Sequence, residues 1–221
     1  MRHPFFTRRT HLMTRNVLPM LLAIATTAAV STTTWAAEPH EPVNHRFCFT
    51  CHGTDGVGSE GIQAPRLAGM EPWYLQRQLE LFRAGGRGKH AEDIQGMEMQ
   101  PMAAILTDEN IADIIEWAAT WEYKPAVPTL TAGNVDNGRQ LYQACATCHG
   151  ADAQGNEAMN APALRGQNDW YMVTQLKNFK AGYRGTDPLD TFGAPMRAMA
   201  AGLRDDQAII DVVSYINTLG R

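Results

Sequence analysis

Cys48-Phe49-Thr50-Cys51-His52-Gly53 is the stretch that decides the fold, because it returns 97 residues later as Cys145-Ala146-Thr147-Cys148-His149-Gly150. The same offset aligns further short motifs without a gap from Cys48 to Leu106, namely Ala64-Pro65 with Ala161-Pro162, Trp73-Tyr74 with Trp170-Tyr171 and Met99 with Met196. A repeat of this length predicts that one structural module occurs twice in the chain.

The repeat divides the chain into two domains. We predict that they span residues 37–122 and 134–221, with residues 123–133 as a linker. Pro125 and Pro128 in this linker disfavour a helix and favour an extended, semi-rigid segment. A domain of fewer than about 100 residues has a marginal hydrophobic core. We therefore expect a large apolar cofactor at the centre of each domain.

Apolar periodicity predicts an all-α fold. In residues 108–121, Ile111, Ile114 and Ile115 share one helical face, and residues 205–219 repeat this pattern. A second pair of helices is expected to begin near Trp73 and Trp170 and to end at glycines. No segment shows convincing strand alternation.

All four cysteines lie in the two Cys-x-x-Cys-His motifs, a spacing typical of covalent attachment of c-type haem. Two thiols on one helical turn can form thioethers with the two vinyl groups of the porphyrin, and the next residue can then ligate the iron. The motifs thus predict thioethers at Cys48, Cys51, Cys145 and Cys148, with His52 and His149 as axial ligands.

Three other uses of the cysteines fit the sequence less well. Structural disulfides do not explain a histidine after each pair. A zinc site made of two Cys-x-x-Cys pairs would have to join cysteines from matching halves of the chain. A thioredoxin-like motif needs a βαβ context, which the sequence does not indicate.

An electron-carrying haem needs a second axial ligand, commonly methionine. Of the 11 methionines, only two pairs are related by the repeat, Met99 with Met196 and Met102 with Met199. The second pair has the spacing of a core stripe leading into the last helix, and methionine is often core filler. The first pair is expected in an irregular stretch, where its side chains can turn back over the haem. We predict Met99 and Met196 as the ligands.

The N-terminus resembles a secretory signal peptide. Four arginines precede an apolar run at residues 18–30, and small residues follow. The run is shorter than the roughly 20 residues of a membrane-spanning helix, so we expect residues 1–36 to be removed by cleavage near Ala36 or Ala37. Cleavage removes four of the 19 Lys and Arg residues and none of the 23 Asp and Glu residues, which leaves a net charge of −8. Such a surface argues against nucleic acid as a partner.

Beyond the haem motif, each half carries Ala-Pro-x-Leu-x-Gly, Trp-Tyr-x-x-x-Gln-Leu-x-x-Phe-x-x-Gly-x-Arg-Gly and Met-x-x-Met-Ala-Ala-x-Leu. With these motifs the chain resembles the dihaem cytochrome c4 family, whose members are tandem class I cytochrome c domains of the bacterial periplasm. The resemblance implies Met99 and Met196 as distal ligands, and Pro65 and Pro162 as the prolines whose carbonyl groups orient the proximal histidines. It departs from the family at the start of the first domain, where Pro42 predicts a truncated opening helix.

The resemblance implies an electron carrier with two covalently bound haem c groups and no substrate of its own. Expected partners are a quinol-oxidising complex or dehydrogenase as donor and a terminal oxidase or another acceptor, and peripheral association with membrane complexes is compatible with the sequence. The alternative is a dedicated cytochrome subunit of a larger dehydrogenase or oxidase complex. A dihaem enzyme fits less well, because haem attachment uses every cysteine and both domains offer the same methionine. Arg87 and Arg184 are either partners of haem propionates or surface residues.

Overall fold

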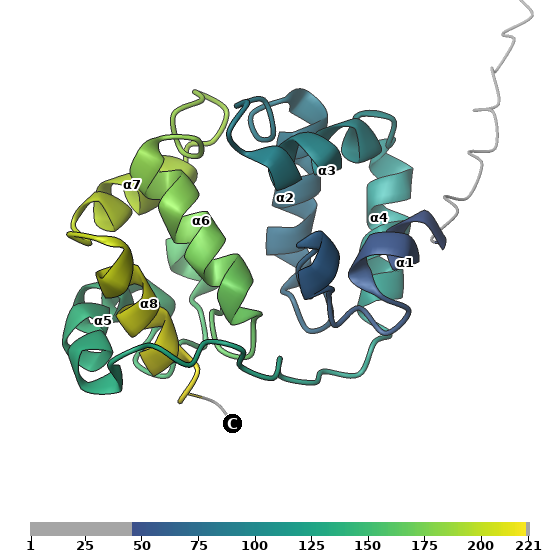
Figure 1. The fold of residues 1–221 in the computed structure, drawn as a ribbon. Coiled ribbons are helices and arrows are strands. Elements are labelled where there is room, and N and C mark those ends of the chain that lie inside the picture. The colour runs from purple at the N-terminus through teal and green to yellow at the C-terminus, as the bar shows by residue number, and fades with distance from the viewer. Residues whose placement is uncertain (1–45, 220–221) are drawn as a thin grey trace, which may run out of the picture. The chain divides into compact units, whose positions relative to one another are not determined.

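Helices form the whole of the regular structure in the part of the chain that the computed structural model describes, residues 46–219 (Figure 1). Apart from two isolated β-bridges, Ser59 with Ala64 and Asn156 with Ala161, these residues form no strand pairing. The all-α prediction is confirmed. The predicted signal peptide and its cleavage near Ala36 or Ala37 lie outside the described residues and stay predictions.

The described residues of the first domain form four α-helices and a short 3-10 helix. They are α1 (Arg46–His52), η1 (Glu60–Ile62), α2 (Pro72–Ala84), α3 (Ile94–Ala104) and α4 (Asp108–Ala118). Helices α2 and α4 have the periodicity that the sequence predicts, and their apolar faces meet in one core of Leu75, Leu79, Ile111, Ile114 and Ala118. The segment before Arg46 lies outside the described residues, so the truncated opening helix stays a prediction.

The second domain repeats this order with α5 (Val135–His149), η2 (Glu157–Met159), α6 (Asp169–Ala181), α7 (Gly193–Ala201) and α8 (Asp206–Ile216). Its core includes Tyr142, Ile209, Val212 and Val213. Helices α5 and α8 pack closely at Gly138, where an added Cβ atom would lie 2.0 Å from the carbonyl oxygen of Asp211. The first and last helices of this domain are thereby held together.

A helix occupies the stretch around each predicted methionine ligand, where the sequence led us to expect irregular structure. Met99 lies in α3 and Met196 in α7. The side chain of Asp93 accepts a hydrogen bond from the backbone N–H of Gly96 at 3.2 Å and so caps the start of α3. The equivalent Asp190 accepts one from Gly193 at 2.9 Å. These buried caps stabilise helix starts whose glycines have low helix propensity.

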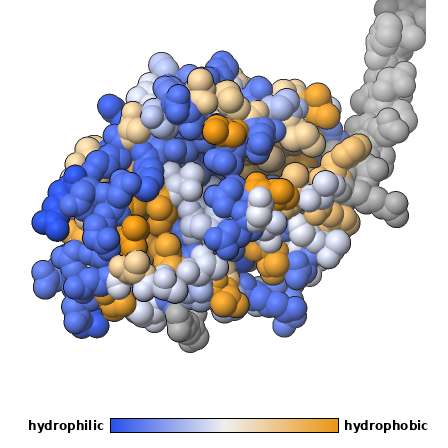
Figure 2. Space-filling view, viewed as in Figure 1, coloured by the Kyte–Doolittle hydropathy of each residue, from blue (hydrophilic) through white to orange (hydrophobic). Residues whose placement is uncertain are grey.

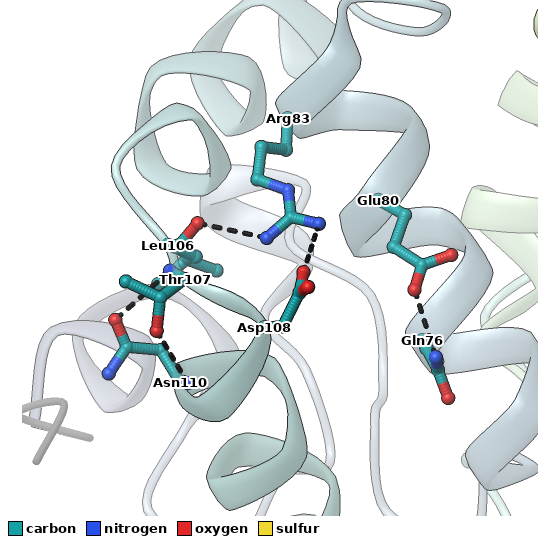
Figure 3. Close-up of polar contacts among 7 residues, drawn as sticks. All are labelled: Gln76, Glu80, Arg83, Leu106, Thr107, Asp108 and Asn110. Atoms are coloured by element: carbon teal, nitrogen blue, oxygen red, sulfur yellow. Dashed lines mark hydrogen bonds and ion pairs between the residues drawn. The ribbon is translucent and has the colours of Figure 1, made fainter. Parts of the chain in front are cut away.

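The contact between α2 and α4 is polar at its edge (Figure 3). The guanidinium group of Arg83 donates to the carbonyl oxygen of Leu106 at 3.1 Å and to the carboxylate of Asp108 at 2.6 Å. Thr107 and Asn110 exchange side-chain and backbone hydrogen bonds in a capping box. The start of α4 is thus capped by Thr107 and held against α2 by Arg83.

The linker is extended, as its prolines predict, and it is bound to the second domain. The carboxylate of Asp169 accepts hydrogen bonds from the backbone N–H of Thr129 at 2.6 Å and of Leu130 at 2.9 Å. The Tyr123 side chain packs against Gly69 and Gly166. A Cβ atom added at either glycine would lie only 2.3 Å from the nearest atom of this side chain. Glycine is therefore required on both sides of this ring.

Hydrophilic residues cover much of the face seen in Figure 2, with apolar side chains between them. Within residues 46–219, no helix is both long and apolar enough to cross a membrane.

Candidate functional site

Each Cys-x-x-Cys-His motif lies on one helix and ends it. Cys48, Cys51 and His52 are in α1, and Cys145, Cys148 and His149 are in α5. Residues at positions i, i+3 and i+4 share a helical face, so both thiols and the imidazole of each motif project from the same side. The four cysteines form no disulfide with one another. This arrangement offers two sulfur nucleophiles and one nitrogen ligand to a single planar group.

Both histidines are buried and oriented by a backbone carbonyl. The Nδ1 atom of His52 lies 2.7 Å from the carbonyl oxygen of Pro65, and that of His149 lies 2.8 Å from that of Pro162. A carbonyl accepts only, so Nδ1 carries the proton and Nε2 keeps its lone pair. The structure thus places both predicted prolines beside the predicted histidines.

The Nε2 atom of His149 is buried and has no hydrogen-bond partner among the described residues. Buried polar atoms are nearly always paired, so an orphaned imidazole nitrogen suits a metal ion held in the adjacent pocket. Burial lowers the pKa of His149, although the hydrogen bond with Pro162 and the charge of Glu71 raise it. Burial also lowers the pKa of His52, against the hydrogen bond with Pro65. Neutral imidazole, the form that binds iron, is therefore favoured in both.

A cavity of about 510 Å³ lies beside His149, large enough for a bulky planar cofactor. Cys145, Cys148, His149 and Met196 from the second domain contribute to its lining, together with residues of the first domain that include Tyr74, Arg77 and Gln78. The residues present fit a haem c group. The pocket of the second domain is therefore completed by side chains of the first.

The two pairs of repeat-related methionines differ in exposure. Met99 is half-buried and packs against the core of the first domain, and Met196 is half-buried in the cavity wall. Met102 and Met199 are each 45% exposed. The expectation that Met102 and Met199 form a core stripe is therefore wrong, because α3 and α7 leave both side chains exposed, although Met199 also lines the cavity beside His149. The half-buried pair suits ligation better.

Arg87 and Arg184 are buried between the domains, which corrects the alternative that they are surface residues. Arg87 donates to the side-chain oxygen of Gln78 at 2.7 Å and to that of Gln175 at 3.0 Å. Arg184 donates to Gln175 at 2.6 Å and to Gln78 at 3.1 Å. Four residues at two pairs of repeat-related positions thus form one network across the interface.

Tyr171 adds a hydroxyl group to this network, since Arg87 donates to it at 3.3 Å. Burial by itself would raise the pKa of Tyr171, but the guanidinium charges of Arg87 and Arg184 lower it overall. Both arginines thus donate to neutral side-chain oxygens in the interface.

A model of the cytochrome c family matches residues 42–121 and 135–220. The chain belongs to this family. Within it, the cytochrome is of the dihaem cytochrome c4 type, as its motifs predict. It therefore carries two covalently bound haem c groups and acts as an electron carrier. The domain limits at residues 37–122 and 134–221 stay predictions.

The relatives of this cytochrome include proteins named thiosulfate dehydrogenase electron acceptor and proteins named cytochrome c4. It is 33% identical to a thiosulfate dehydrogenase electron acceptor of Stutzerimonas stutzeri, over 79% of each chain. It is 31% identical to cytochrome c4 of Azotobacter vinelandii, over 78% of this chain and 84% of that one. The solved structure of cytochrome c4 from Pseudomonas stutzeri is similar with a TM-score of 0.62 and 29% identity, over 80% of this chain and 95% of that one.

Sequence reasoning missed several residues at the interface between the two domains of the cytochrome. Gln78 and Gln175 stood in the repeat motif, but they were not recognised as interface residues. Glu71 and Asn168 also occupy equivalent positions in the two halves, and each contacts the opposite domain. The signal available for both pairs was their shared offset of 97 residues.

Proposed function

We propose that this cytochrome passes electrons between redox proteins through two haems with the same His/Met ligation. Cys48 and Cys51 tether the first haem, and His52 and Met99 are its axial ligands. The equivalent ligands of the second haem are His149 and Met196, with thioethers at Cys145 and Cys148. The orphaned Nε2 atom of His149, facing a cavity that Met196 also lines, is the observation that carries this proposal.

The residues of the chain hold and shield the haem, which supplies the one-electron chemistry when bound. The thioethers fix the edge of the porphyrin to the helix, and the prolines fix the orientation of the imidazole rings. A carbonyl that accepts from Nδ1–H raises the basicity of a metal-bound histidine. A methionine on the other side raises the reduction potential. Two filled axial positions leave no open coordination position for a substrate.

A role as an electron carrier without catalysis is favoured because haem attachment uses all four cysteines. An axial cysteine, which the related thiosulfate dehydrogenases use, requires a fifth cysteine beyond the four in the haem motifs, and the chain has four. We therefore assign no catalytic residue. The alternative of a dedicated subunit differs from a free carrier in whether the protein is isolated alone or within a complex.

We further infer a periplasmic protein that receives electrons from a dehydrogenase or quinol-oxidising complex and delivers them to a terminal oxidase. The name of the Stutzerimonas stutzeri relative supports a dehydrogenase as donor. The predicted signal peptide supports export, which suits haem attachment outside the cytoplasm.

Purification of the mature protein from a host with c-type maturation machinery tests the proposal. A pyridine haemochrome spectrum is expected to give two c-type haems per chain, and a redox titration two one-electron steps. N-terminal sequencing is expected to begin near Ala37. A colourless protein, or one that binds zinc in place of haem, would contradict the proposal.

A further inference from the structure

The peptide bond that follows each of the two repeat-related prolines, Pro65 and Pro162, carries a hydrogen bond at both ends. In the second domain, the carbonyl oxygen of Pro162 accepts from His149 at 2.8 Å. The N–H of the same peptide unit, which belongs to Ala163, donates to the carboxylate of Glu71 at 2.7 Å. Glu71 lies in the first domain, directly before α2. A continuous chain of hydrogen bonds therefore joins a carboxylate of one domain to the histidine of the other.

The first domain contains the equivalent chain. The carbonyl oxygen of Pro65 accepts from His52 at 2.7 Å, and the N–H of Arg66 donates to the side-chain oxygen of Asn168 at 2.7 Å. Asn168 lies in the second domain at the position equivalent to Glu71. Each domain thus supplies the end of the hydrogen-bond chain that orients the histidine of its neighbour.

The two chains differ in the group at their end, a carboxylate in one and a neutral amide in the other, and in the residue that donates to it, Ala163 in one and Arg66 in the other. A carboxylate is a stronger acceptor than a neutral amide, and hydrogen bonds to ionised groups are roughly twice as strong as neutral ones. Linked hydrogen bonds polarise one another. The bond from Ala163 to Glu71 therefore makes the Pro162 carbonyl a stronger acceptor for His149 than the Pro65 carbonyl is for His52.

The surroundings of Glu71 are tight enough to keep this bond in place. Gly155 has a φ of +83°, and a Cβ atom at that position would lie 2.9 Å from the Oε1 atom of Glu71. Negative charge that reaches a metal-bound imidazole favours the more positive, ferric state of the iron.

We propose that Glu71 and Asn168 are positioning residues that act across the domain interface on the proximal histidine of the other domain, and that the carboxylate of Glu71 lowers the reduction potential of the second-domain haem. This inference rests on the proposed axial roles of His52 and His149. The interface thereby gives different reduction potentials to two haems that have the same axial ligands.

A buried cation lies near this chain of bonds. The guanidinium group of Arg66 donates to the carbonyl oxygen of Ala68 and lies 4.9 Å from the centroid of the Tyr123 ring. Burial lowers the pKa of Arg66, whereas Tyr123 and Glu71 raise it. Its positive charge offsets part of the charge of Glu71. The effect of Glu71 is therefore measured as the change in reduction potential of the second-domain haem when the carboxylate is removed.

The test compares Glu71→Gln and Asn168→Asp in the complete dihaem protein by spectroelectrochemical titration. Glu71→Gln is expected to raise the potential of the second-domain haem so that the ferrous-to-ferric ratio at a fixed potential changes two- to tenfold, or about 18 to 59 mV for one electron. In the same variant, the reduction potential of the first-domain haem is expected to remain unchanged. Asn168→Asp is expected to lower the first-domain potential instead.

A control and an assignment complete the design. Glu157 is an exposed carboxylate of the second domain between its histidine and its proline, so Glu157→Gln removes the same charge without touching the hydrogen-bond chain. It is expected to leave both potentials unchanged. A Met99→His background, in which the first-domain potential falls, assigns each titration step to its domain.

A second readout separates polarisation from mere structural support. The Nδ1 proton of His149 is expected to exchange with solvent faster in Glu71→Gln, whereas that of His52 keeps its rate, as followed by NMR. The inference is overturned if Glu71→Gln retains the absorption spectrum of both haems but leaves both potentials unchanged. It is also overturned if this variant shifts both potentials by the same amount. An unchanged ferric spectrum in His149→Ala would overturn the axial assignment and this inference with it.

Discussion

Gln78 and Gln175 each accept hydrogen bonds from the same two guanidinium groups, those of Arg87 and Arg184. All four side chains are buried. In each guanidinium group the Nε atom has no partner among the described residues, so the glutamine oxygens carry much of the compensation for two buried charges. A protein interior tolerates such charges only when they are hydrogen-bonded.

Replacement of one glutamine is therefore expected to weaken the domain interface. Gln175→Met removes one acceptor from both arginines, and a buried donor left unsatisfied costs about 1–3 kcal/mol. The free energy of unfolding from denaturant titration measures this loss. Gln76→Met, on the exposed side of α2, loses only the hydrogen bond to Glu80 (Figure 3) and is the matched control. Equal stability of the two variants would contradict the assigned role of the network.

The methionine assignment predicts a spectroscopic loss in two steps. Met99→Ala and Met196→Ala are each expected to abolish half of the far-red ferric absorption band that marks methionine–iron ligation, and to lower one potential, because a methionine ligand raises it. The double variant is expected to lose the band. Met102→Ala and Met199→Ala are the controls and are expected to retain it. Retention of the band in either of the first two variants would transfer the ligand role to another residue.

Asp169 makes the docking of the linker dependent on pH. Burial would raise the pKa of its carboxyl group, but hydrogen bonds from Leu130, Thr129 and Trp170 lower it below its ordinary value. A carboxyl group with a lowered folded-state pKa contributes stability above its unfolded pKa of about 4 and loses it as the pH falls through the folded value.

We accordingly expect Asp169→Asn to reduce stability at pH 7 and to make the acid loss of stability shallower than in the unmodified protein. Thermal unfolding followed from pH 7 to pH 2 measures both effects. Asp206 is fully exposed and makes its hydrogen bond to Lys177, so Asp206→Asn serves as a control away from the linker. A parallel acid response in Asp169→Asn and the unmodified protein would contradict this role.

Gly138 is expected to tolerate no side chain. An added Cβ atom would lie 2.0 Å from the Asp211 carbonyl oxygen and 2.9 Å from the Cβ atom of Tyr215. Gly138→Ala must push α5 away from α8, and overpacking of this kind costs about 1–3 kcal/mol. Calorimetry of the holoprotein measures the loss. Gly61→Ala has open space around it and is expected to change stability little; a comparable loss there would show that the close approach is not the cause.

Sequence reasoning succeeded where the repeat or the periodicity carried the information. The apolar faces of α2, α4, α6 and α8 follow a helical period, and the shared offset singled out the two haem motifs. Helices α3 and α7 were not predicted, because Gly96 and Pro101 within α3 and Gly193 at the start of α7 have low helix propensity. Their stability comes from buried carboxylate caps that become visible only in three dimensions.

The contacts across the interface could not be predicted either, for a different reason. Arg87 and Arg184 follow glycine-rich turns, where an arginine is usually solvated, and nothing local indicates that they are buried. The bond from Ala163 to Glu71 joins residues 92 positions apart and follows no period. The repeat fixed which residues are equivalent but not which of them meet.

The interface built from Gln78, Arg87, Gln175 and Arg184 is self-complementary, since each half contributes the same pair of residues to the other. A lone module with this glutamine and arginine carries the face needed to pair with its own twin about a twofold axis, as isologous dimers do. Joining two genes for such a homodimer would preserve its contacts. Later divergence at one pair of equivalent positions, such as a glutamate in one half and an asparagine in the other, then gives two formerly identical redox centres separate properties.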